Sequence, residues 1–144
     1  MRRQSFITIL GAALFVVVAA AKIEAQAVGA EDLVTIAKRK FKELTNAEEK
    51  LLQSISSGDT ADFSSGTEKE NDPAKAEAWG KERVLKADRI AWLCTTPQAS
   101  TLVTHRGIVI KGALIDKDLD LAFAKIPFPL VLEKCAILKK STAK

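Results

Sequence analysis

The residue types that most often perform enzyme chemistry are sparse in this 144-residue chain. It contains one histidine, His105, and two cysteines, Cys94 and Cys135. No serine or cysteine nucleophile lies in a recognisable motif around His105, so catalytic triads and histidine-based metal sites lack the residues they require. The seven glycines form no phosphate-binding loop. We therefore predict no catalytic, cofactor-binding or metal-ligating residues, and we expect a protein that is not an enzyme.

Three alternating aspartates, Asp116, Asp118 and Asp120, have the spacing of the first ligands of a calcium loop. Such a loop continues with a glycine and, six positions later, a glutamate. The corresponding positions here hold Leu121 and Pro127. We therefore interpret the three aspartates as solvated charges.

The most regular part of the sequence, residues 108–140, consists of three eleven-residue units. The units read IVIKGALIDKD, LDLAFAKIPFP and LVLEKCAILKK, and places one, three, six and eight are apolar in each. These places scatter around an α-helix, and a straight strand would divide them between its two faces. They can share one interior only if the chain bends twice per unit, which predicts short inward-facing segments. A β-meander with coincidental spacing is the alternative.

The inward pairs Leu-x-Leu, Ala-x-Ile and Cys-x-Ile of these units resemble those of pentapeptide-repeat and other right-handed β-helix proteins. The run from Arg106 to Leu121 also resembles the opening of bacterial envelope proteins that continue into longer solenoids. The resemblance implies a short right-handed β-solenoid of about one and a half coils. Because so short a repeat buries little apolar surface alone, we expect the preceding helices to cap it.

The two cysteines permit one disulfide in an exported chain. Cys135 occupies place six of its unit, where the other two units have Ala113 and Ala124. A thiol at such a place packs like a small apolar side chain. Free thiols are therefore favoured, with the disulfide as the alternative.

Residues 1–27 have the pattern of a signal peptide. Arg2 and Arg3 precede a predominantly apolar run at 6–21, and Ala25-Gln26-Ala27 provides a small-x-small cleavage site. Sixteen residues are short for a membrane span, which takes about twenty. We expect an exported bacterial protein, periplasmic or extracellular. An inner-membrane anchor formed by residues 6–21 is the alternative, and membrane contact is expected only in that case.

Charge argues against a nucleic-acid partner. The full chain has a net charge of +4, but without residues 1–27 it carries 19 basic and 17 acidic residues, a net charge of +2. Mixed charges of this kind do not form the basic surface that nucleic acids require. The possible partners are a protein or a second copy of the chain, bound at the open edge of the solenoid.

The region 28–107 is predicted to be a helical cap. Helical spacing of apolar residues predicts one helix over 31–44 and, after a capping box at Thr45–Glu48, another to about residue 56. Residues 58–72 are predicted to form a mobile loop. Asp72-Pro73 predicts a further helix start, and Lys81–Cys94 the strongest later helix. Trp79 and Trp92 are expected to anchor the core.

The predicted fold is thus α+β, with amphipathic helices (28–107) capping a short right-handed β-solenoid (108–140), followed by a tail (141–144). The favoured function is that of a non-enzymatic structural or protein-interaction scaffold. The alternative is a periplasmic small-molecule-binding or catalytic protein. Its site would lie between the helices and the repeat, near Trp79, His105 and the 58–72 loop.

Overall fold

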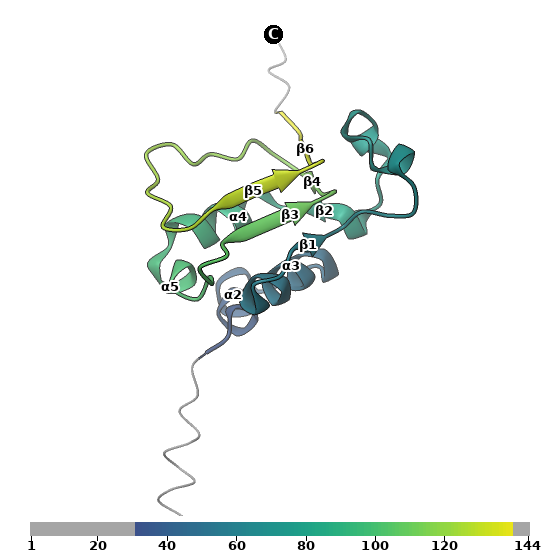
Figure 1. The fold of residues 1–144 in the computed structure, drawn as a ribbon. Helices are drawn as coiled ribbons and strands as arrows, with labels where there is room; N and C mark the ends of the chain where they lie inside the picture. The colour runs from purple at the N-terminus through teal and green to yellow at the C-terminus, as the bar shows by residue number, and fades with distance from the viewer. Residues whose placement is uncertain (1–30, 140–144) are drawn as a thin grey trace, which may run out of the picture. The chain divides into compact units, whose positions relative to one another are not determined.

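A computed structural model describes residues 31–139 of the chain (Figure 1). The α-helices are α2 (Leu33–Phe41), α3 (Asn46–Ser57), α4 (Ala87–Thr95) and α5 (Pro97–Ser100), and the 3-10 helices are η1 (Glu68–Asn71), η2 (Pro73–Ala78) and η3 (Lys81–Arg83). The strands are β1 (Ala61–Asp62), β2 (Val84–Leu85), β3 (Ile108–Lys111), β4 (Leu114–Ile115), β5 (Leu130–Glu133) and β6 (Ala136–Ile137). The predicted signal peptide, 1–27, and the predicted tail, 141–144, lie outside the described residues.

The first two described helices form where their sequence pattern predicts them. Asp32 caps α2 by accepting a hydrogen bond from the Thr35 amide at 2.7 Å. The predicted capping box of α3 is confirmed, because Thr45 Oγ1 accepts from the Glu48 amide at 3.2 Å and Glu48 Oε2 accepts from the Thr45 amide at 2.9 Å. Gly58, with φ at 73°, ends α3 in the left-handed conformation that glycine adopts readily.

The strands form two small parallel sheets, in the orders β1-β3-β5 and β2-β4-β6. In both sheets the last two strands pair at a distance of 22 positions along the chain, with Ile108 opposite Leu130 and Leu114 opposite Ala136. Helix α3 packs against β1, β2 and β3. The strands β5 and β6 therefore lie at the sheet edges away from α3, as Figure 1 shows for β5.

The prediction of a right-handed β-solenoid is wrong. The structure has two separate three-stranded parallel sheets instead, and the second eleven-residue unit, 119–129, contributes no strand to either. Pro127 and Pro129 in that unit have no amide hydrogen to donate to a strand ladder. Phe123, at φ 61°, turns the backbone away from an extended conformation. The predicted α+β class holds, but the α-helices accompany sheets rather than cap a coil.

The inward-facing places of the three units differ in burial. Those of the first unit, which are Ile108, Ile110, Ala113 and Ile115, are all fully buried. Those of the second unit are half-buried, and in the third unit Leu130, Leu132 and Cys135 are half-buried while Ile137 is 42% exposed. The apolar pattern therefore forms a closed core only at the first unit. Its strands are the central ones, β3 between β1 and β5 and β4 between β2 and β6.

The helix predicted over Lys81–Cys94 is also partly wrong. Val84 and Leu85 form β2, which pairs with β4, and α4 begins only at Ala87. The Lys86 side chain gives no capping hydrogen bond to α4, and Asp116, just after β4, supplies one from a distance. Its Oδ1 accepts from the Ala87 amide at 3.1 Å. Pairing with a distant strand thus outweighs the local helical periodicity.

Candidate functional site

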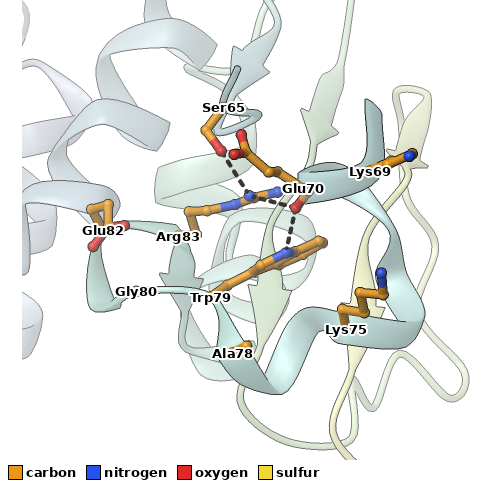
Figure 2. A pocket seen from close by; sticks show the side chains of 9 residues that line it. All are labelled: Ser65, Lys69, Glu70, Lys75, Ala78, Trp79, Gly80, Glu82 and Arg83. Atoms are coloured by element: carbon orange, nitrogen blue, oxygen red, sulfur yellow. Dashed lines mark hydrogen bonds between the residues drawn. The ribbon is translucent and has the colours of Figure 1, made fainter. Parts of the chain in front are cut away.

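A cavity of about 530 Å³ brings together two features that the sequence suggested for a ligand site (Figure 2). Trp79 forms one wall, and Ser65, Lys69 and Glu70 of the 58–72 segment also line it. The cavity falls in the size range of small-molecule pockets. His105 is exposed and does not line it.

Arg83 is the central residue of this cavity, and no pattern in the sequence singles it out. Its side chain is only 5% exposed. The Nε group donates to the Gly112 carbonyl at 2.9 Å, and Nη2 donates to Asn71 Oδ1 at 3.1 Å. The Nη1 group donates to the Glu70 carbonyl at 3.3 Å and, more weakly, to Ser65 Oγ at 3.4 Å. Four of the five guanidinium N–H groups thus have neutral acceptors.

Trp79 stacks on this guanidinium rather than packing in the core. The Arg83 Cζ atom lies 3.7 Å from the centre of the Trp79 ring. The indole Nε1 donates to the Glu70 carbonyl at 2.8 Å, so one carbonyl receives hydrogen bonds from both side chains (Figure 2). Trp92, by contrast, is buried against Phe41 with ring centres 5.3 Å apart. The prediction of a core anchor is right for Trp92 and wrong for Trp79.

Positively charged side chains outnumber negatively charged ones at this cavity. Among residues 31–139, no carboxylate lies within ion-pair distance of Arg83, although Glu82 and Asp62 attract it from farther away. Burial lowers the pKa of the Arg83 guanidinium, and the Glu82 and Asp62 charges partly oppose that shift. Lys69 and Lys75 also line the cavity, so its cations outnumber its two carboxylates, Glu70 and Glu82.

Arg89 is the other arginine that is buried within residues 31–139, and unlike Arg83 it has a carboxylate partner there. Its Nε lies 3.2 Å from Glu48 Oε1, and the Glu48 side chain is 1% exposed. The Arg89 Cζ atom also lies 3.7 Å from the centre of the Phe41 ring. A paired charge of this kind joins α2, α3 and α4 and fits a structural role.

Asp118 and Asp120 are exposed, as the interpretation of solvated charges expects, but that interpretation is wrong for Asp116, which is half-buried. Asp116 caps α4, and Asp120 Oδ1 accepts from the Ala122 amide at 3.0 Å. Within residues 31–139, no group of histidine, cysteine and acidic side chains is arranged to hold a metal ion. Cys94 and Cys135 are both free thiols, the first buried and the second half-buried.

A second candidate site is the pair of free strand edges at β5 and β6. Within residues 31–139, each of these strands has a neighbour on one side only. Val131 is 39% exposed, Ile137 42% and Leu138 36%, so the surface beside the edges is apolar. Apolar side chains next to unpaired strand edges are typical of surfaces that bind another strand.

The direction of the main-chain groups of β5 follows from its pairing with β3. The Ile108 amide donates to the Pro129 carbonyl at 2.9 Å, and the Gly112 amide donates to the Glu133 carbonyl at 2.9 Å. In a parallel pair, alternate residues of a strand bond to the same neighbour. Leu130 and Leu132 therefore point their amide and carbonyl groups toward the free side of β5.

Comparisons with family models, curated proteins and solved structures found no match to the chain. The resemblance to pentapeptide-repeat proteins is thus supported neither by a family match nor by the sheets of the structure. No helix within residues 31–139 has the length and apolar composition that a membrane span requires. The predicted signal peptide, 1–27, and the alternative anchor predicted at 6–21 fall outside that range.

Proposed function

We propose that the protein is a non-enzymatic, exported bacterial scaffold that binds another protein through the free edges of β5 and β6. The observation that carries the proposal is the combination of unpaired main-chain groups at Leu130 and Leu132 with half-buried apolar side chains at the same residues. An added strand would satisfy those hydrogen-bonding groups and cover that apolar surface in one step. Main-chain pairing supplies affinity in this binding mode, and alternate side chains supply specificity.

The test is a photo-crosslinking amino acid at Val131, which points away from the core beside the free edge. We expect crosslinks to one defined partner in the cells that produce the protein. Leu132→Pro should abolish them, because proline removes the outward-pointing amide. Leu132→Ala is the matched control, since it loses the same side chain but keeps the amide. Equal crosslinking in both variants, or equal crosslinking from exposed Gln98 on α5, would exclude strand addition.

We propose small-molecule binding at the Arg83 cavity as the second candidate function. Its support is a buried guanidinium that has no carboxylate partner within residues 31–139, at a cavity of about 530 Å³ whose lining carries more cations than anions. A small aromatic or aliphatic carboxylate fits this chemistry, because Lys69, Lys75 and the one guanidinium N–H of Arg83 without an acceptor offer positive charge, and Trp79 offers an apolar wall.

The cavity can be tested by titrating a panel of carboxylates while tryptophan fluorescence is recorded. Binding should change the emission of the wild-type protein but not that of Trp79→Phe, which retains only Trp92. Lys75→Gln should weaken the response without unfolding the protein, because Lys75 is exposed. A flat response to the whole panel would remove this candidate and leave the scaffold proposal unaffected.

A further inference from the structure

We infer that the strand accepted by β5 runs parallel to it and carries a lysine or arginine opposite Glu133. This inference rests on the proposed function, strand addition at the β5 edge, and specifies the chemistry of the partner. It follows from the side chains that are already aligned across β1, β3 and β5.

Charge alternates along one row of this sheet. Asp62 of β1 is opposite Lys111 of β3, and Lys111 is opposite Glu133 of β5. The Lys111 ammonium lies 3.9 Å from Asp62 Oδ2. Opposite charges directly across two strands stabilise a sheet, and like charges destabilise it.

Glu133 ends the row with its charge uncompensated. Its side chain is exposed, and within residues 31–139 it forms no ion pair. Lys134, the next residue, is instead paired with Glu68 at 3.1 Å. The next position of the row, on an added strand, is therefore complementary to a cation.

Apolar residues fill the neighbouring rows. Ile108 is opposite Leu130 and Ile110 is opposite Leu132. Both isoleucines are fully buried, and Ile110 has a paired strand on each side, whereas the two leucines are half-buried. An added strand must place apolar side chains beside both leucines. Opposite residues 130–133 it therefore reads apolar, any residue, apolar, basic.

The parallel direction follows from the pairing of the two sheets. All strand pairs in residues 31–139 are parallel. Two residues, Lys134 and Cys135, separate the end of β5 from the start of β6. A segment that runs parallel to β5 can bend at the same place and continue onto β6, so it extends both sheets with the pairing that they already have.

The chain itself contains a probe with this pattern. Residues 108–115 read Ile-Val-Ile-Lys-Gly-Ala-Leu-Ile, with the lysine in fourth place. A Gly-Ser-flanked peptide of this sequence and its Lys-to-Glu counterpart are titrated against the full-length protein at low ionic strength. We expect the lysine peptide to bind about three- to tenfold more tightly, as an exposed cross-strand pair allows.

Changing the protein charge completes the test. Glu133→Lys should reverse the preference, and Glu133→Gln, which adds no repulsion against Lys111, should make the two peptides equal. Leu132→Pro should prevent binding of both. Equal affinities of the two peptides for wild-type protein would overturn the charge rule but leave strand addition standing. Absence of binding by either peptide, or binding that survives Leu132→Pro, would overturn strand addition itself.

Discussion

Arg83 joins parts of the chain that are far apart in sequence. Its guanidinium links the Gly112 turn between β3 and β4 to Ser65, Glu70 and Asn71. The planar fork of arginine reaches several acceptors at once, whereas a lysine ammonium acts as a compact point charge. We therefore expect the geometry of the donors to contribute more to the stability of the fold than the positive charge does.

Arg83→Met is expected to lower the free energy of unfolding by about 2–4 kcal/mol, because the buried Gly112 carbonyl and three part-buried acceptors lose their donor. Arg83→Lys should recover less than half of that loss. Urea denaturation followed by tryptophan fluorescence measures both variants, and Lys81→Met, at an exposed neighbouring position, is the control. A fully stable Arg83→Lys protein would show that charge alone suffices.

The two thiols should differ in reactivity. Burial raises the pKa of Cys94 to about 11, and burial also raises the pKa of Cys135. The folded state thus favours the neutral Cys94 thiol. The stabilisation that the folded protein gains from this neutral thiol is complete below the usual thiol pKa of about 8.5. It is lost as the pH rises toward 11.

At pH 8 we expect iodoacetamide to modify Cys94 at least about 100-fold more slowly than a free thiol, since the thiolate is the reactive form. The rate should rise toward pH 11 and on addition of urea. Cys135→Ala isolates the Cys94 reaction, and Cys94→Ala isolates that of Cys135. Modification of folded Cys135→Ala at the rate of a free thiol would contradict the buried environment.

At the scale of elements, glycine determines how β3 begins. Gly107 has φ 77°, and a Cβ at this position would overlap the Pro129 carbonyl oxygen. That carbonyl is the acceptor for the Ile108 amide, so the glycine lies where β3 and β5 start to pair. A side chain would have to displace the beginning of β5.

Gly107→Ala is expected to destabilise the protein by about 2–4 kcal/mol, combining left-handed backbone strain with the steric overlap. Gly80→Ala is the matched control, because Gly80 has an ordinary φ of −69° and its added Cβ would meet only the flexible Glu82 side chain. Its effect should stay within about 0.5 kcal/mol. Thermal unfolding of both proteins gives the comparison, and equal losses would argue against a special role for Gly107.

The sequence predicted those elements that depend on near neighbours. The capping box at Thr45–Glu48 and the helix start at Asp72-Pro73 are local signals, and both were confirmed. Strand β2 was missed because its partner, β4, lies about 30 residues later in the chain. The role of Arg83 was not predictable for the same reason, since its acceptors come from residues 65–71 and 112.

The eleven-residue period was correctly found but wrongly converted into a fold. Period alone does not say which units pair, and the structure pairs the first with the third. The second unit has the same apolar places, yet Pro127 and Pro129 remove two donors and the unit forms no strand. A regular pattern thus specified which side chains turn inward better than it specified the hydrogen-bonding partners.

At the scale of the described fold, burial decreases from the central strands to the free edges. Ile110 lies between β1 and β5 and is fully buried, whereas Leu132 on β5 is half-buried at a free edge. Local opening costs least where strands have one neighbour and few buried contacts. The free-edge strands should therefore open without unfolding of the rest.

Amide hydrogen exchange should accordingly be much slower at Ile110 than at Leu132, by roughly 100-fold or more. The Leu132 amide points to the free side of β5, while Val131, whose amide faces β3, should fall between the two. Protection of Leu132 equal to that of Ile110 would show that the β5 edge is already covered in solution.

The spacing of 22 positions between paired strands also has a consequence for the order of assembly. A chain that emerges N-terminus first, from a ribosome or a translocation pore, completes β3 and β4 before β5 and β6 are synthesised or delivered. The last strands can then be added to a surface already formed, without disturbing earlier pairings. Successive addition leaves the newest strand of each sheet with one free side, and within residues 31–139 these newest strands are β5 and β6.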